Sequence, residues 1–352
     1  MTFIPSLIVA AGHAHYSDPA AGPEREERIV RSATLTCLLI LAASFSPVDG
    51  QENPPEALEK FVVHEWGVQV RSMARVKVAV GMTAHGEGKL MSALIPPMAL
   101  TDDLPAFVLR HSGNYTPERT QRMWKKPVIH LYGPEGLEVG IEVHTPLGTP
   151  WAYWPEPTLI EGSFSFMGST IRTATGMKWS GKLLREAGAG NGPIKIDEKH
   201  WWHTVREVPS RYFQTEGGTE RFVFYEGTAV QGPAVTADLS VEVLKLHNTG
   251  SAPSSQILVI VNDLSTRRFM VVDPLPANGE AIIKREDMLK AEGDEAKLLG
   301  ACAAQWQSLG MTEAESQAIV ETWKPDLLDR PGMLVISRIP AALYDQMRGR
   351  GR

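Results

Sequence analysis

The sequence predicts a mainly β fold: an antiparallel sandwich or jelly-roll-like domain with a C-terminal helical hairpin. Between residues 61 and 273, short β-type runs are separated by Gly, Pro, Asn and Asp, a pattern typical of antiparallel sandwiches and barrels. Helical patterns do not alternate with these runs, so a doubly wound α/β fold is not expected. The predicted strands are 61–70, 76–80, 127–132, 137–145, 163–166, 201–208, 221–225, 241–246, 257–261 and 269–272, with a last one at 333–336.

The clearest local pattern in the β-rich part is a hairpin. The runs 128–132 and 137–141 flank a short loop that contains Gly and Pro. Closing this loop would pair His130 with Val139 and Tyr132 with Leu137. Because alternate residues of a strand share a face, these residues would form an apolar face interrupted by His130.

The pattern becomes helical near residue 280. Apolar residues recur at helical spacing between 298 and 309, and Gly310 follows as a C-cap. Thr312 and Glu315 then form a capping box that opens a second helix, and we expect Pro325 to end it. A short segment near Leu343 closes the chain.

Two tryptophans and one cysteine should be buried in this helical part. Helical spacing places Trp306 and Trp323 on apolar helix faces. Cys302 shares the face of Trp306, which favours a small buried residue over a nucleophile.

The N-terminal region has the three parts of a secretory signal. Basic residues at 25, 28 and 31 precede an apolar run at 33–45, and small and turn-forming residues follow at 46–50. The run is shorter than the ~20 residues that a membrane span needs. We therefore expect residues 1–50 to be a signal segment with an upstream extension, 51–60 a polar linker, and 61–352 one β-rich domain whose helical part begins near 280.

This pattern predicts an exported protein, periplasmic or extracellular, with no stable membrane insertion after the signal is removed. The mature chain should begin near Gln51 and would lack Cys37, so Cys302 would have no partner for an intramolecular disulfide. The net charge of −6 argues against a nucleic-acid partner. We interpret the short basic group that includes Lys125 and Lys126 as solvated surface.

Several segments together resemble a known group. Val-His-Glu-Trp-Gly at 63–67, Lys-Pro-Val-Ile-His-Leu-Tyr at 126–132, Arg-Phe-Val-Phe-Tyr-Glu-Gly at 221–227 and Val-Glu-Thr-Trp at 320–323 occur in this order. In this they resemble a group of exported bacterial proteins that open with a His-Glu-Trp-Gly motif and have no assigned reaction. The resemblance implies export and a single folded unit, and carries no site residues.

The candidate catalytic residues are histidines on predicted strands. Strand alternation places His64 on the apolar face of its strand, with Glu65 pointing the other way, and places His130 on an apolar face of another. Each could be a core histidine with a hydrogen-bond partner. Alternatively the two could converge and, with His203 or Glu207, bind zinc in a metal-dependent hydrolase.

Other histidines offer weaker patterns. His200 and His203 have a spacing that would place both rings on one side of a helix, but the two Trp and the β-branched residues that follow His200 favour a strand, where the rings diverge. His144 should lie with Glu142 on the face opposite His130.

An aromatic cluster is the candidate ligand-binding surface. Trp151, Tyr153 and Trp154 could form a platform for a glycan, or the edge of the core. The sequence lacks nucleophile-elbow and phosphate-loop motifs. It therefore favours an exported, non-catalytic binding or structural protein with a glycan or protein partner and no cofactor. The alternative is the zinc hydrolase.

Overall fold

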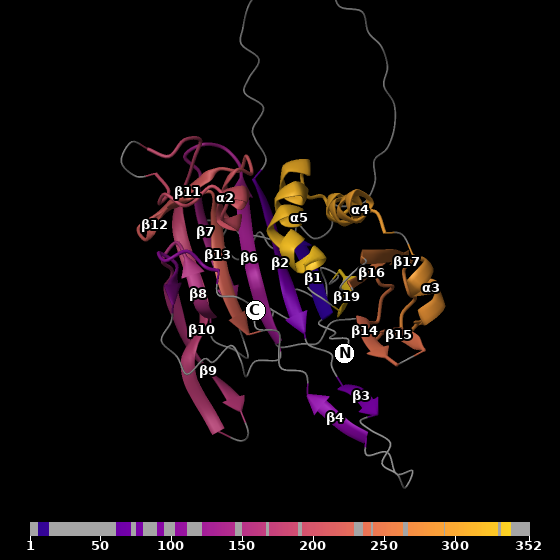
Figure 1. Cartoon of the computed structure of the whole chain (residues 1–352). Helices are drawn as coiled ribbons and strands as arrows, with labels where there is room; N and C mark the ends of the chain where they lie inside the picture. Colours follow the sequence, from indigo (N-terminus) through magenta and orange to yellow (C-terminus); the bar gives the residue numbers. More distant parts are fainter. Residues whose placement is uncertain are drawn as a thin grey trace, which may run out of the picture.

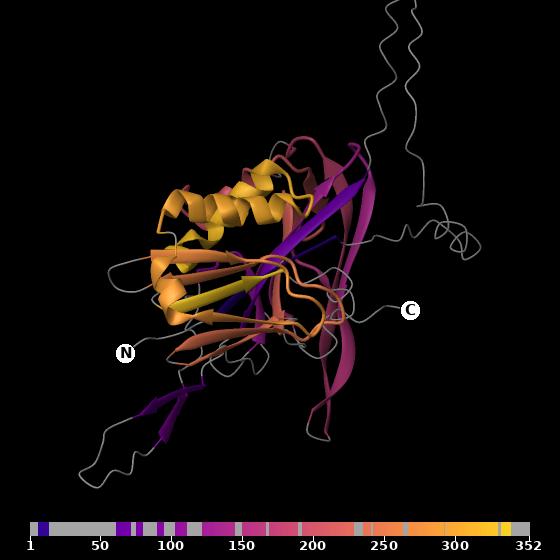
Figure 2. The same cartoon turned by 90° about the vertical axis from the view of Figure 1, so that its right-hand side faces the viewer.

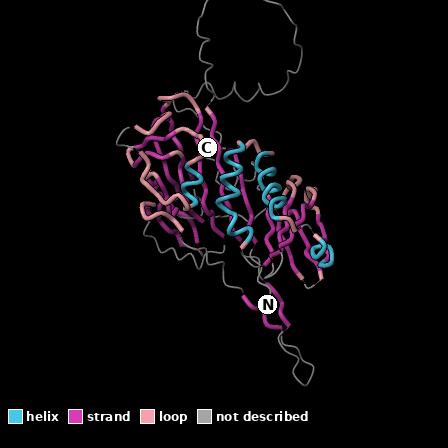
Figure 3. Tube along the Cα trace, turned by 45° about the horizontal axis from the view of Figure 1, so that its top comes forward, coloured by secondary structure: helices cyan, strands magenta, loops and turns pink. Residues whose placement is uncertain are grey.

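The chain is mainly β, with antiparallel sheets on both sides of a layer of helices (Figures 1 and 3). The computed structural model describes residues 6–13, 61–71, 75–79, 90–94, 103–110, 122–144, 150–166, 169–188, 192–228, 235–240, 242–262, 267–291, 293–329 and 332–338. The predicted fold class, a mainly β chain of antiparallel sheets with helices near the C-terminus, is confirmed.

Two sheets form the first sandwich. Its central sheet has the strand order β1 (Ser6–His13), β2 (Val62–Arg71), β6 (Arg122–Tyr132), β13 (Phe222–Thr228), β8 (Pro150–Trp154) and β5 (Leu109–Arg110). Its outer sheet has the order β12 (Gly218–Glu220), β11 (Tyr212–Thr215), β10 (Ser169–Leu184) and β7 (Glu138–His144), with β9 (Thr158–Phe166) also paired to β10. Alternate residues of β6, such as Ile129 and Leu131, pack against Ile141 and Trp179 between the two sheets.

Two smaller sheets form a second sandwich. One sheet has the order β17 (Arg267–Val272), β16 (Ile257–Asn262) and β19 (Gly332–Ser337), and the other β14 (Val235–Leu239), β15 (Val243–Asn248) and β18 (Glu280–Lys284). Leu246, Val259 and Val335 belong to the core between them. The short helix α3 (Arg285–Lys290) follows β18, and a separate ribbon pairs β3 (Arg75–Ala79) with β4 (Leu90–Leu94).

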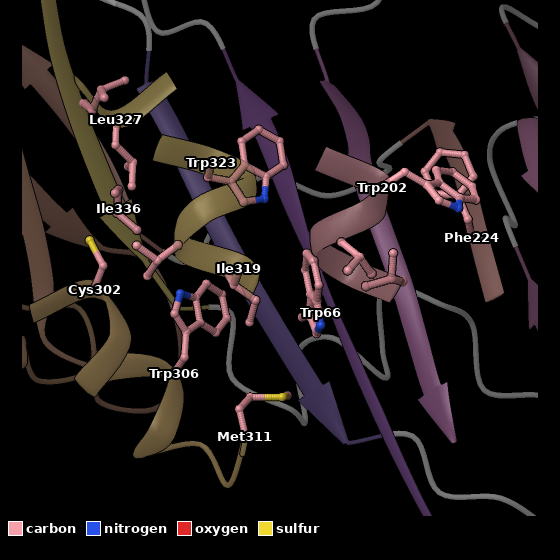
Figure 4. Close-up of a cluster of buried hydrophobic side chains, with 14 of the residues drawn as sticks. Trp66, Trp202, Phe224, Cys302, Trp306, Met311, Ile319, Trp323, Leu327 and Ile336 are labelled. Atoms are coloured by element: carbon pink, nitrogen blue, oxygen red, sulfur yellow. The ribbon is translucent and has the colours of Figure 1, made fainter. Parts of the chain in front are cut away.

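Helices fill the space between the two sandwiches. They are α2 (Trp201–Arg206), α4 (Glu295–Gln307) and α5 (Glu313–Leu328). One continuous apolar core joins the central sheet to these helices and to the β16–β17–β19 sheet. Figure 4 shows it: Ile336 and Cys302 lie on one side of α5, and Trp66 and Trp202 on the other. Figure 2 shows α4 and α5 above the second sandwich. These helices therefore connect the two halves.

The expected C-terminal helical hairpin is present. Thr312 and Glu315 make both bonds of the capping box at the start of α5. Trp306 and Trp323 are buried, as expected, at 7% and 2% exposure. Burial raises the pKa of Cys302 to about 12, so this thiol is no nucleophile. The expected end at Pro325 is wrong, since α5 continues through it to Leu328.

The predicted hairpin of β6 and β7 is also wrong. β6 pairs with β2 and β13, whereas β7 pairs with β10 in the other sheet. The loop between them has backbone partners elsewhere: the Gly136 N–H donates to the Leu183 carbonyl at 2.7 Å, and the Leu183 N–H donates to the Leu137 carbonyl at 2.9 Å. The chain therefore crosses between sheets at this loop, and β6 and β7 face each other across the core.

Three expected N- and C-terminal features lie outside the described residues: the apolar run 33–45, the linker 51–60 and the segment near Leu343. Within the upstream extension, β1 pairs antiparallel with β2. In the described part of the chain, none of the helices has the length and apolar character of a membrane span.

Candidate functional site

The central sheet brings His64 and His130 together. They are direct partners in the antiparallel pairing of β2 with β6, which matches the expectation that they converge. Both are buried, at 7% and 0% exposure. His144 lies on β7 in the outer sheet, where its Nε2 is 2.6 Å from Glu142 Oε1. The two histidines on the central sheet are thus the pair that could share chemistry.

A carboxylate from α5 covers His64. The two oxygens of Glu315 lie 3.0 and 2.8 Å from His64 Nδ1. One of them also accepts the Thr312 N–H at 2.8 Å, which is the capping-box bond. Burial alone would raise the pKa of Glu315, but the bond to His64, the nearby His130 ring and the Thr312 N–H together hold it below its usual range. Glu315 therefore ties α5 to the sheet as an ionised group.

His130 is enclosed in the core. Its Nδ1 lies 3.1 Å from Ser210 Oγ, and this hydroxyl donates its hydrogen to the Arg221 carbonyl at 2.8 Å. His130 Nδ1 must therefore be the donor, which leaves Nε2 as an acceptor, and no described residue donates a hydrogen bond to it. Burial lowers the pKa of His130 to about 4, although Glu315 and the Arg221 backbone act in the opposite direction. The ring is neutral at physiological pH.

Aromatic rings flank His130 on both sides. The ring centroids of Trp66 and Phe222 lie 6.3 and 5.9 Å from its centroid. A general base must come within hydrogen-bond reach of its substrate. Because His130 is fully buried between these rings, its surroundings are those of a core histidine and not those of a group that accepts a proton from a substrate.

His203 and Glu207 do not join this pair. They form a loose surface contact across one turn of α2, with 3.9 Å between Nε2 and Oε1. Among the residues that the structure describes, no three His, Cys, Asp or Glu side chains are grouped so that they could hold a metal ion. The zinc set of His64, His130 and His203 is therefore not assembled in this structure.

The expected strand at 201–208 is wrong, because its first six residues form α2. His200 is the N-cap: its Nδ1 accepts the Trp202 N–H at 3.1 Å, and its Nε2 lies 2.7 Å from the Asp103 carbonyl. The helix buries Trp202 and Val205 on one face. This burial, together with the cap, outweighs the β preference of the β-branched residues.

The interpretation of Lys126 as solvated surface is also wrong. It is 7% exposed and lies at a β-bulge with a φ of 49°. Its Nζ is 2.7 Å from Asp103 Oδ2, and 4.7 and 5.2 Å from the ring centroids of Trp201 and Trp323. A bulge redirects a side chain, and here it turns the lysine toward the helices. Like-charged neighbours in the sequence gave no sign of this.

The aromatic cluster of β8 offers no exposed platform. Trp151, Tyr153 and Trp154 are 8, 7 and 8% exposed, so they form the core edge that was the alternative interpretation. Trp151 Nε1 donates to Glu226 at 3.2 Å. Stacking on a sugar needs an accessible ring face, which these residues lack.

A cavity of about 390 Å³ lies where the end of α4 meets the end of β19. Trp306, Leu309 and Ile336 form part of its apolar lining, and Gln305 and Arg338 contribute polar groups. Gln305 Nε2 and Arg338 Nε are both buried without a hydrogen-bond partner among the described residues. The sequence pattern did not indicate this site, because its residues come from separate elements and form no motif.

Comparisons with known proteins give no further assignment. No protein-family model, curated protein or solved structure matches the chain.

Proposed function

We propose that this chain is an exported, non-catalytic binding protein that holds a small organic ligand in the cavity between α4 and β19. The observation that carries the proposal is the lining of this cavity, in which unsatisfied nitrogens of Gln305 and Arg338 accompany an apolar wall. Ligand sites usually have a volume of about 300–1,000 Å³ and combine apolar walls with a few polar groups. A bound ligand would supply the hydrogen-bond partners that these two nitrogens lack among the described residues.

The histidines support a structural role. His64 is bonded to Glu315, His130 to Ser210, and His200 caps α2. The first contact holds α5 on the central sheet, the second holds a loop against β6, and the third fixes the start of α2. The hydrolase hypothesis needs His203 or Glu207 beside the central pair, an arrangement that the described residues do not provide.

Export is part of the proposal and is supported by the N-terminal sequence. A basic start, a short apolar run and a polar exit precede residue 51. Partners on the surface of the sheets, a glycan or another protein, have no comparable support, because the aromatic cluster expected to carry them is buried.

A ligand screen with two matched variants tests the binding function. The screen contains anionic, cationic and neutral compounds of about 10–15 non-hydrogen atoms. This size suits the cavity volume at roughly 30 Å³ per water-sized group. Each compound is added to the protein, and the thermal unfolding midpoint of the protein is recorded. A ligand at about 100 times its Kd should stabilise the protein by about 2.7 kcal/mol. If no compound raises the midpoint, the proposal is wrong.

The variants locate the bound compound. Ser308 lines the cavity at the end of α4 and is exposed, so Ser308→Trp should fill the cavity without removing core contacts. Gln307→Trp places the same side chain on the preceding, also exposed, position outside the lining. Stabilisation should be lost in Ser308→Trp and kept in Gln307→Trp. Equal loss or equal retention in both would place the ligand elsewhere.

A further inference from the structure

We infer that the ligand of this cavity carries a carboxylate, bound by the Arg338 guanidinium and the Gln305 amide, on an aromatic or aliphatic body that packs against Trp306. The inference rests on the proposed binding function and names its ligand class.

Arg338 is a half-buried cation that has no counter-ion among the residues that the structure describes. No carboxylate in the described ranges forms an ion pair with it, its Nε is buried without a hydrogen-bond partner there, and partial burial lowers its pKa below the usual value for arginine. A guanidinium nevertheless stays protonated in proteins. Removing a charge from water is unfavourable unless an opposite charge or hydrogen bonds replace the lost hydration. An anionic group in the cavity would provide both.

The hydrogen-bonding capacity of the lining favours a group that only accepts. The hydroxyls of Ser255 and Ser308 already donate their hydrogens to the backbone, at 3.1 Å to Gln256 and 2.7 Å to Gln305. The side-chain groups left unsatisfied, Gln305 Nε2 and Arg338 Nε, are donors. An ionised carboxylate has two oxygens and no hydrogen to donate. A hydroxyl-rich ligand such as a sugar also carries hydrogen-bond donors, and the lining offers fewer acceptors for these than it offers donors for a carboxylate.

Charge and shape favour a carboxylate over a phosphate. Arg338 is the cationic side chain of the described lining, and one guanidinium balances the single charge of a carboxylate. Its planar fork matches the two carboxylate oxygens in a bidentate pair. A phosphate with close to two negative charges would keep an uncompensated charge in the cavity.

The remaining lining determines the body of the ligand. Trp306, Leu309, Ile336 and Pro274 contribute apolar surface beside the two donors. Trp306 is 7% exposed and belongs to the core, so its indole is held in place. At roughly 30 Å³ per water-sized group, the volume accepts about a dozen non-hydrogen atoms. Aryl- and alkyl-carboxylic acids of this size fit both features.

The test compares acids with amides of the same skeleton. 4-Phenylbutyrate, indole-3-propionate and decanoate are titrated by calorimetry against the full-length protein, each beside its carboxamide, with phenyl phosphate as the second anion. At least one acid should bind at least ~10-fold more tightly than its amide, since hydrogen bonds to charged groups contribute more than neutral ones. Binding should be lost in Ser308→Trp and kept in Gln307→Trp.

Arg338→Gln is the decisive variant, because it keeps an amide donor and removes the charge. It should weaken the binding acid at least ~10-fold and leave its amide within about 3-fold. Without ligand, its urea midpoint should equal or exceed that of the unchanged protein, because the variant removes a half-buried charge that has no counter-ion among the described residues. A lower midpoint would show that Arg338 has a protein counter-ion and would overturn the inference.

The outcomes separate the two proposals. If amides bind as well as acids and Ser308→Trp abolishes both, the binding function stands and the carboxylate is wrong. Tighter binding of phenyl phosphate than of every acid also overturns the carboxylate. If none of the probes binds, the carboxylate inference fails, and the wider screen then decides the binding function.

Discussion

Acidification from pH 7 to pH 4 should lower the free energy of unfolding by about 3 kcal/mol through His130 alone. Burial lowers the pKa of this ring from 6.5 to about 4. Between these values the unfolded chain binds a proton at this residue and the folded chain does not, so stability falls as the pH falls. At about 1.4 kcal/mol per pKa unit, the full shift corresponds to between about 3 and 4 kcal/mol, of which about 3 kcal/mol is lost by pH 4, where the folded ring is half protonated. Below pH 4 both states are protonated there, and the loss stops growing.

The range between pH 6 and pH 5 excludes the contribution of Glu315, although His200, whose pKa burial also lowers, adds to the slope there. Glu315 has a lowered pKa, so its own contribution to stability is present above about 4.5, the ordinary value, and is lost only as the pH falls below it. Urea unfolding followed by tryptophan fluorescence at several pH values gives the slope. One proton corresponds to about 1.4 kcal/mol per pH unit.

Two variants assign the slope to His130. His130→Asn keeps a donor beside Ser210 and removes the titrating ring, so the slope between pH 6 and pH 5 should fall by about 1.4 kcal/mol per pH unit. Ser210→Ala should lower stability by about 1 kcal/mol and keep the slope, because His130 remains buried. If His130→Asn keeps the full slope, or if the unchanged protein shows none, the assignment of a neutral, enclosed ring is wrong.

Three further predictions concern other parts of the fold. Glu315→Gln should lower the free energy of unfolding by about 3 kcal/mol, because it removes the charge from a buried pair. Glu313 is exposed in the same helical turn, so Glu313→Gln should lower the free energy of unfolding by less than about 1 kcal/mol. Equal effects of the two variants in urea unfolding would contradict the buried pair. Gly67→Ala places a Cβ 2.8 Å from the backbone of β6 and should destabilise by about 1–3 kcal/mol. Gly300→Ala, in open space on α4, should stabilise by about 1 kcal/mol; the same sign for both would refute the packing argument. N-terminal sequencing of exported protein should find a start near Gln51, and a terminus upstream of residue 31 would contradict the signal segment.

The sequence predicted correctly those strands and helix ends that are determined by neighbouring residues. The runs 61–70, 257–261 and 269–272 correspond to β2, β16 and β17, because alternating or continuous apolar residues mark buried strands. The start of α5 was predictable because a capping box involves only neighbouring residues, Thr312 and Glu315.

Strand partners were not predictable from the same signals. β6 and β7 both present an apolar face to the core between the sheets, through residues such as Ile129 and Ile141. Two strands of a hairpin and two strands facing each other across a sandwich have the same alternation, so the pattern alone does not distinguish them. Pairing was decided by backbone bonds to β10, a strand that the sequence pattern did not reveal.

The candidate site residues were also predictable only in part. Alternation indicated that His64 and His130 lie on apolar faces, and the structure buries both. The partner of His64 is Glu315, 251 residues away in the sequence, and no local pattern connects them. Gln305 and Arg338 had no signal at all, because an unsatisfied donor becomes visible only when the surrounding atoms are known.

The His-Glu-Trp-Gly segment of β2 shows how a short motif can specify a joint between layers. Its alternation sends His64 toward Glu315 of α5 and Trp66 into the core beneath the helices, while Glu65 points to the outer sheet and accepts a hydrogen bond from the Tyr225 hydroxyl. Gly67 lies at the bulge against β6, where a side chain would collide with the neighbouring backbone. Each of the four positions therefore has a structural requirement that differs from its neighbours. The residues of the motif are therefore explained by packing and hydrogen bonding alone, whereas the unsatisfied donors at the end of α4 are not explained by the described fold.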